Sequence, residues 1–210
     1  MMIQPDAADP KSRILSHAFE LFRRSGFAHV SVEEITSGVG MSKKTFYKYF
    51  ESKHDLIRQI VERIVGELHI RIRAIVDSDQ PFLRKLNLLS SLITARFKTL
   101  SAPLLRDIQI HSPESWTYIQ DFRRDKILTA WGSLIEQGKR EGLIRPDVNS
   151  RLFVLSLLGV VEHVVDPAVL ANESFSADEA LRDIVQMFSR GILTEQAVHQ
   201  LHALQLEPQT

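Results

Sequence analysis

The sequence predicts an all-α fold, and three observations lead to this prediction. Apolar residues recur at helical spacing along nearly the whole chain, whereas no run of β-branched residues alternates with polar ones as in a strand. Residues that cap helix N-termini precede many of these periodic stretches. Proline and glycine then divide the pattern into successive helices.

The composition is that of an ordinary globular protein. The 210 residues include 26 basic and 26 acidic side chains and no cysteine, which excludes disulfides and thiolate metal sites. No apolar run is long enough and sufficiently free of charged residues to span a bilayer. Residues 1–10 lack the apolar stretch of a signal peptide. We therefore expect a cytoplasmic location.

The N-terminal part of the chain follows the plan of a helix-turn-helix. Asp9 and Pro10 suit the start of a first helix, and Gly26 followed by Phe27 predicts a left-handed helix stop. Residues 31–34 match a capping box that opens a short helix, and glycines at 38 and 40 permit a tight turn. Ser42 caps a second short helix. Two short helices joined by a turn, after a longer helix, form this motif.

The second short helix has the composition of a helix that enters the major groove. Between residues 41 and 53 there are four lysines and one glutamate, and four minus one gives a local charge of +3. The lysines can neutralise phosphates, and the hydroxyl side chains can donate hydrogen bonds to phosphates or base edges. Phe46 and Phe50 lie four residues apart and are expected to face inward. Taken alone, however, such a lysine face is more often merely solvated.

The stretch GFAHVSVEEITSGVGMSKKTFYKYFESK, residues 26–53, resembles the DNA-binding domain of the TetR (tetracycline repressor) family. The residues that match the family pattern are Gly26, Ser31, Val32, Ile35, Gly40, Ser42, Thr45, Phe46, Tyr47, Tyr49, Phe50, Ser52 and Lys53. Thr36 and Gly38 stand where alanine is usual, and both are expected to loosen the first helix of the motif slightly. Met41 replaces valine, and Lys44 replaces a common glycine.

The resemblance implies a DNA-binding surface and a larger helical domain for effector binding and dimerisation. The residues expected at the DNA are Ser31, Ser42, Lys43, Lys44, Thr45, Tyr47, Lys48, Tyr49 and Lys53. The expected domains are residues 9–55, with the first part of a connecting helix over 53–77 at their end, residues 56–195, and a flexible tail over 196–210. Pro81, Pro103 and Pro113 begin further helices, and the helix after Pro113 is expected to be long and to end at Gly142.

A helix from Asn149 to about Leu170 predicts a subunit interface, because it is apolar on nearly all sides and must be covered on all sides. A last helix after the capping box at residues 176–179 has a one-sided apolar stripe, and the two helices can form a four-helix bundle with a second subunit. The alternative is that both helices are internal core. The candidate interface residues are Leu152, Leu155, Leu158, Gly159, Val161, Ile184 and Phe188.

The effector pocket is assigned more loosely, since each candidate is also a suitable core residue. The candidates are Leu68, Ile72, Leu89, Ile93, Phe97, Trp116, Phe122, Trp131, Ile135 and His163. The expected effector is a small hydrophobic or amphipathic molecule. The sequence shows no catalytic constellation and predicts no cofactor and no metal site.

These observations predict a homodimeric regulator, most simply a repressor, that binds a double-stranded DNA operator and is released by the effector. The alternative is an all-helical small-molecule-binding or enzymatic protein whose headpiece no longer binds DNA. A gel-shift assay with DNA from the promoter region beside the protein's own gene discriminates between the two.

Overall fold

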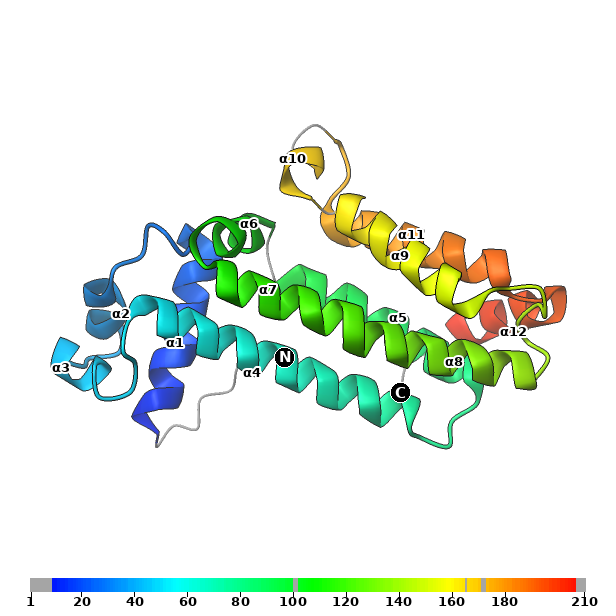
Figure 1. The fold of residues 1–210 in the computed structure, drawn as a ribbon, viewed down its shortest axis with the longest axis horizontal. Helices are drawn as coiled ribbons and strands as arrows, with labels where there is room; N and C mark the ends of the chain where they lie inside the picture. The colour runs from blue at the N-terminus through cyan, green and yellow to red at the C-terminus, as the bar shows by residue number, and fades with distance from the viewer. Residues whose placement is uncertain (1–8, 100–101, 165, 171–172, 207–210) are drawn as a thin grey trace. The chain divides into compact units, whose positions relative to one another are not determined.

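The computed structural model describes residues 9–99, 102–164, 166–170 and 173–206, and these form helices joined by short loops (Figure 1). The helices are α1 Pro10–Ser25, α2 Val32–Gly38, α3 Lys43–Phe46, α4 Lys53–Val76, α5 Phe82–Thr99, α6 Ala102–His111, α7 Pro113–Phe122, the π-helix η1 Arg123–Ile127, α8 Leu128–Arg140, α9 Ser150–Val164, α10 Pro167–Leu170, α11 Ala177–Ile192 and α12 Glu195–Leu206. The described residues contain no strand, only an isolated bridge between Ile144 and Leu193. The all-α prediction is confirmed. None of the helices in these ranges is long and apolar enough to cross a membrane.

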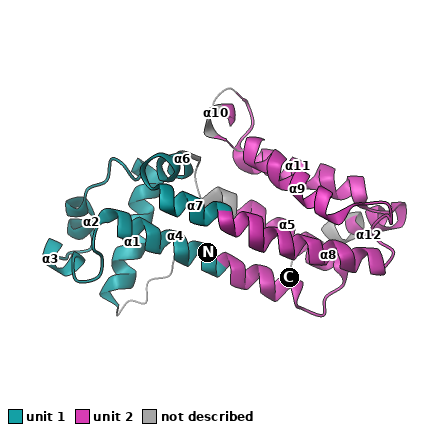
Figure 2. Ribbon diagram, in the orientation of Figure 1, with its two compact units in different colours: residues 1–67, 100–120 teal, residues 68–99, 121–210 magenta. Residues whose placement is uncertain are grey.

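The chain forms two compact units (Figure 2). The first comprises residues 1–67 and 100–120, and the second comprises residues 68–99 and 121–210. The first unit thus includes α6 and most of α7 as well as the helix-turn-helix, which differs from the boundary expected after residue 55. Two contacts explain this grouping, because the Asp107 carboxylate accepts the Ala28 N–H at 3.2 Å and His54 hydrogen-bonds the His111 carbonyl at 3.0 Å. Such long-range contacts leave no local signal in the sequence.

Side-chain caps fix the starts of several helices as expected. The Asp9 carboxylate accepts the N–H groups of Lys11 and Ser12, each at 3.1 Å, with Pro10 in the first helical position. Complete capping boxes open α2 at Ser31 and α11 at Ser176. Each box satisfies backbone N–H groups that a helix start leaves without partners.

The stop of α1 differs from the expected one. Gly26 has φ 80° and ψ 155°, so its φ is positive but its ψ is extended rather than left-handed helical. Only glycine adopts this region readily. The Gly26 N–H still bonds the Phe22 carbonyl at 2.9 Å, which closes the last helical turn. The prediction of a glycine stop is confirmed, whereas the left-handed conformation assigned to it is wrong.

The long helix expected after Pro113 is interrupted by η1, in which the hydrogen-bonded turn holds one residue more than in an α-helix. The helical path nevertheless ends as expected, with Gly142 at φ 69°. Residues 196–206, expected in a flexible tail, instead form most of α12. The side chain of Ala197 is fully buried, and the Thr194 N–H bonds the Leu143 carbonyl at 3.0 Å, so the start of α12 is held by the second unit.

Candidate nucleic-acid interface

The headpiece has an interior of aromatic and aliphatic side chains that positions α3. Phe46 and Phe50 are fully buried, with their ring centroids 5.3 Å apart. Ile35 of α2 and Phe22 of α1 are fully buried in the same unit. The two inward-facing residues predicted for the second short helix are thus confirmed, and burial of these side chains fixes which face of α3 remains outside.

The turn between α2 and α3 is tight and closed by backbone hydrogen bonds. Gly40 has φ 68°, its N–H bonds the Ser37 carbonyl at 3.1 Å, and the Met41 N–H bonds the Thr36 carbonyl at 2.9 Å. Ser42 then caps α3 by accepting the Thr45 N–H at 3.1 Å. Although α3 itself has four residues, the Phe50 N–H bonds the Phe46 carbonyl at 3.1 Å, so helical turns continue through the tyrosines.

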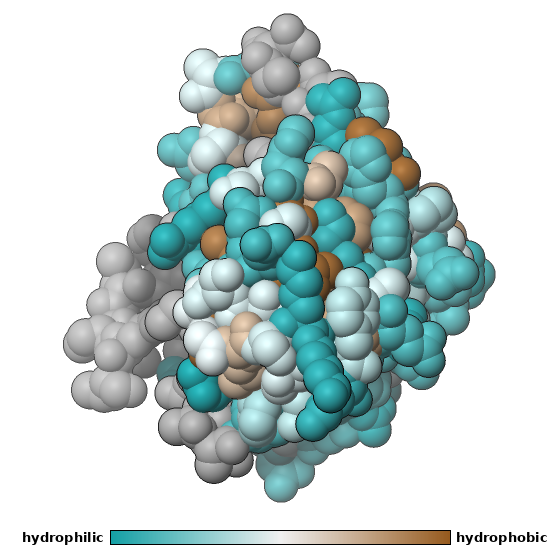
Figure 3. Space-filling view, turned by 90° about the vertical axis from the view of Figure 1, so that its left-hand side faces the viewer, coloured by the Kyte–Doolittle hydropathy of each residue, from teal (hydrophilic) through white to brown (hydrophobic). Residues whose placement is uncertain are grey.

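The outer face of this segment is polar and cationic. Tyr47 is 56% exposed, and Lys43, Lys44 and Lys48 are exposed as well. On the face drawn in Figure 3, hydrophilic and near-neutral residues cover most of the surface. Ser31, Ser42 and Tyr49 are also exposed, so seven of the nine expected DNA-contact residues lie on the surface, whereas Thr45 and Lys53 are half-buried.

Lys43 already has an acidic partner. Its ammonium nitrogen lies 2.7 Å from a Glu33 carboxylate oxygen, and both side chains are largely exposed. This hydrogen bond raises the pKa of Lys43 and lowers the pKa of Glu33. A phosphate would have to compete with Glu33 for this lysine. Lys44 and Lys48 have no ion pair among the described residues, so their charges are immediately available.

Three of the expected hydroxyl contacts also have local roles. The Ser31 hydroxyl donates to the Glu34 carboxylate at 2.7 Å as part of the capping box. The Ser42 and Thr45 hydroxyl oxygens lie 3.0 Å apart, and either can donate to the other. Their capping roles were visible in the sequence for Ser31 and Ser42. Contact of any of the three with DNA stays a prediction.

Lys53 is held by the headpiece itself. Its ammonium group donates to the carbonyls of Phe27 at 2.9 Å, Ala28 at 3.3 Å and Val30 at 2.9 Å. The nitrogen also lies 4.6 Å from the centre of the Phe27 ring, a cation–π contact. Burial lowers the pKa of Lys53. Lys53 therefore joins the start of α4 to the loop between α1 and α2, a role that the sequence reasoning missed.

The expected effector-pocket residues are mostly interior. Ile72, Leu89, Phe122, Trp131 and Ile135 are buried, Leu68, Ile93 and Trp116 are half-buried, and His163 is exposed. Trp116 belongs to the first compact unit and the other residues to the second, and the Phe97 side chain lies outside the described residues. A cavity of about 660 Å³ in the second unit is lined by none of the ten. Their role in effector binding stays a prediction.

The interior of the second unit contains polar groups that the sequence reasoning missed. The His69 Nδ1 atom is buried without a hydrogen-bond partner among the described residues, and its ring packs edge-on against Phe122 at 6.1 Å. Arg123, the first residue of η1, is largely buried with a guanidinium nitrogen 4.0 Å from a Glu162 carboxylate oxygen. Burial lowers the pKa of Arg123. A helical pattern gives no signal for such groups, because polar residues at these positions can equally face solvent.

The expected subunit-interface residues divide between the surface and the interior. Leu152 and Leu155 of α9 are 63% and 47% exposed, and Gly159 lies exposed on the same side of the helix. Leu158, Val161 and Phe188 are half-buried, and Ile184 is buried. The rings of Phe153 and Phe188 meet at 5.7 Å, which joins α9 to α11.

Comparison with known proteins finds a family model that matches the headpiece. Residues 14–60 match the family described as bacterial regulatory proteins, tetR family. The HTH-type transcriptional regulator YvaF of Bacillus subtilis (strain 168) is 26% identical over 188 residues, which cover 88% of this chain and 96% of YvaF. The HTH-type transcriptional repressor KstR2 of Mycobacterium tuberculosis (strain CDC 1551 / Oshkosh) is 25% identical over 146 residues, covering 66% of this chain and 71% of KstR2.

Solved structures share the fold over most of the chain. A regulator of the TetR/AcrR family from Thermobifida fusca superposes with a TM-score of 0.65 at 26% identity, covering 86% of this chain and 97% of that one. A putative transcriptional regulator from Saccharomonospora viridis gives a TM-score of 0.72 at 19% identity, covering 91% and 100%, and at this identity it supports the fold alone. The match over residues 14–60 and the motif geometry above show that the chain carries a helix-turn-helix domain of the kind found in bacterial regulatory proteins of the tetR family.

Proposed function

We propose that the protein is a ligand-responsive repressor that binds its operator as a homodimer and is released by a small hydrophobic or amphipathic effector. The observation that carries this proposal is the division of the α3 segment into two faces. Phe46 and Phe50 hold it from inside, while Lys44, Tyr47 and Lys48 are accessible from outside. A segment supported in this way presents its polar face to a major groove without losing its packing.

In this proposal the lysines neutralise phosphates and fix the position of the protein on the duplex, whereas Thr45 reads a base edge. Lys44 and Lys48 bind phosphate directly, whereas Lys43 binds phosphate after its ion pair with Glu33 is broken. Because Lys43 and Glu33 form a solvent-exposed pair, separating them costs little free energy. The Glu33 interaction therefore lowers the affinity for DNA only slightly.

Dimerisation is supported by the unpartnered apolar surface of α9 and α11. Leu152 and Leu155 are exposed on α9, and Met187 is 63% exposed on α11. Exposed apolar side chains that gather on adjoining helices are typical of a surface covered by another subunit. Gly159, also exposed, allows the helices of two subunits to approach closely.

Release of DNA requires an effector that binds more tightly to the state in which the two headpieces have the wrong spacing. A dimer needs its half-sites about 34 Å apart, one helical repeat of DNA, so a modest change of headpiece spacing abolishes simultaneous contact. An effector with equal affinity for both states would leave the DNA bound.

A gel shift with the DNA beside the protein's own gene tests operator binding. Sedimentation of Leu155→Glu tests the dimer, with Leu88→Glu as a matched control, since Leu88 is a comparably exposed leucine (41%) on α5. We expect Leu155→Glu to sediment as a monomer with weakened operator binding and Leu88→Glu to remain a dimer. A wild-type monomer at micromolar concentration, or no shift of any fragment of this DNA, contradicts the proposal.

A further inference from the structure

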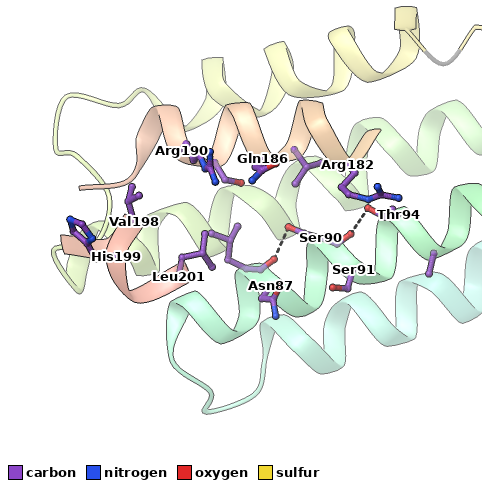
Figure 4. A pocket seen from close by; sticks show the side chains of 14 residues that line it. Asn87, Ser90, Ser91, Thr94, Arg182, Gln186, Arg190, Val198, His199 and Leu201 are labelled. Atoms are coloured by element: carbon purple, nitrogen blue, oxygen red, sulfur yellow. Dashed lines mark hydrogen bonds between the residues drawn. The ribbon is translucent and has the colours of Figure 1, made fainter. Parts of the chain in front are cut away.

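A cavity of about 660 Å³ lies within the second compact unit, between α5, α11 and α12 (Figure 4). Small-molecule sites in proteins typically measure about 300–1,000 Å³, so this cavity is large enough for a ligand. None of the residues assigned above to DNA or to the subunit interface lines it. The cavity is therefore a separate feature of the second unit.

The inner wall of the cavity is apolar. Leu86 of α5 and Val185 of α11 are buried residues that line it, and the half-buried Leu201 of α12 lines it as well. In Figure 4 the side chain of Leu201 extends from α12 toward α5. A hydrocarbon body placed against these three side chains would leave water, which favours its binding in proportion to the apolar area buried.

The polar side chains that line the cavity differ between the end near Thr94 and Arg182 and the end near Arg190. The Ser90 hydroxyl donates to the Leu86 carbonyl at 2.7 Å, and the Thr94 hydroxyl donates to the Ser90 carbonyl at 3.0 Å. Their hydrogens are therefore engaged, and these two side chains offer only lone pairs. Arg182, which lies near Thr94 in Figure 4, forms an ion pair with Asp178 at 3.4 Å. This end of the cavity suits an anion poorly.

The other end gathers donors without partners. Arg190 has no ion pair or hydrogen bond among the described residues, and the same holds for the side chain of Gln186. Gln186 and Arg190 lie four residues apart on α11, so their side chains are neighbours on one face, as Figure 4 shows. No carboxylate is among the residues that line the cavity, so its charge is positive.

We propose that this cavity binds an amphipathic carboxylate, with its head group on Arg190 and Gln186 and its hydrocarbon body against Leu86, Val185 and Leu201. A guanidinium donates two parallel hydrogen bonds to a carboxylate, which favours this head group over a neutral one. The inference goes beyond the proposed function, because it concerns binding at this cavity whether or not that binding releases DNA.

The test is a calorimetric titration of the full chain with octanoate at low salt, without DNA. 1-Octanol and octyltrimethylammonium serve as neutral and cationic probes of similar length. We expect octanoate to bind about tenfold more tightly than octanol, and octyltrimethylammonium to bind most weakly. Arg190→Gln is expected to lower octanoate affinity about tenfold while leaving octanol affinity unchanged. The matched control is Arg84→Gln, an exposed arginine on α5 outside the cavity, which should bind octanoate like the wild type.

A second variant tests the location independently of charge. Ser91 is an exposed lining residue of α5, so Ser91→Trp is expected to be tolerated by the fold and to fill the cavity. It should abolish binding of octanoate and octanol alike. Absence of octanoate binding in the wild type overturns the proposal, and so does unchanged affinity in both Arg190→Gln and Ser91→Trp. A gel shift on the same preparations tests operator binding separately, so failure of this inference is distinguishable from failure of the proposed function.

Discussion

Gly38, the last residue of α2, stands where the family commonly has alanine, and its surroundings predict what restoring that alanine would do. A Cβ built on Gly38 would overlap Nε2 of the His17 imidazole and would lie under 3.0 Å from two of its ring carbons. His17 belongs to α1 and is half-buried. The imidazole therefore occupies the space that an alanine side chain would need, and Gly38→Ala must displace it.

The size of the effect follows from two opposing contributions. Replacing glycine by alanine favours a helix by up to about 1 kcal/mol, and less at a helix end. Forcing extra volume into an occupied site costs roughly 1–3 kcal/mol, and the lower part of that range applies because the imidazole can rotate. We expect Gly38→Ala to destabilise the protein by about 1 kcal/mol, or about 2–4 °C in the melting temperature of a chain of this size.

The double variant His17→Ala/Gly38→Ala isolates this contact. With the imidazole removed, alanine at residue 38 meets no obstruction and its helix propensity is recovered. Thermal unfolding of the wild type, both single variants and the double variant, followed by circular dichroism, gives the coupling energy. We expect the double variant to be more stable than the sum of the two single changes by about 1 kcal/mol. Strict additivity, or a Gly38→Ala variant more stable than the wild type, would refute this account.

Other changes have equally specific outcomes. Lys48→Ala should lower the slope of log operator affinity against log salt by about one for each subunit, so about two in a dimer, and an unchanged slope would leave Lys48 a solvated lysine. Tyr47→Ala should weaken operator binding with an unchanged circular dichroism spectrum, because its ring is largely outside the core. Lys53→Met should lower the melting temperature by several degrees, since three carbonyls lose their donor, and an unchanged melting temperature would contradict that role. Gly138→Ala should also lower the melting temperature, because its Cβ would lie 2.8 Å from the buried Phe82 ring, and a neutral result would show that the ring moves freely.

The helix starts were largely predictable because their signals are local. Asp9, Ser31, Ser42 and Ser176 each accept an N–H group within their own first helical turn, so residue type and spacing suffice. The interior faces of α2 and α3 were predictable for the same reason, since the spacing of apolar residues sets which side is buried. Thr36 was expected to loosen α2. Its buried hydroxyl instead donates a hydrogen bond to the Glu33 carbonyl at 3.1 Å, within the same helix.

Features that depend on contacts between distant segments were not predictable. Residues 196–206 were expected in a tail, yet contacts of residues 193 and 194 with 143 and 144 hold the start of α12 in the second unit. The widened turn η1 has no propensity signal, since its residues are ordinary helix formers. The structural role of Lys53 depends on carbonyls more than twenty residues earlier, whereas its charge and its place in the family pattern had suggested a DNA contact.

The cavity illustrates most clearly why a pocket is harder to predict than a core. The candidates chosen from the sequence were apolar residues on periodic faces, and such faces are the ones that pack in close contact. A cavity forms where packing between helices is incomplete, which depends on the relative positions of three helices and on side-chain lengths. The residues that line this one include Asn87, Gln186 and Arg190, which in a helical pattern look like a solvated face. Polar side chains that recur at helical spacing on the flank of an amphipathic helix therefore belong among the candidates for a ligand site, because such a site needs donors beside its apolar wall.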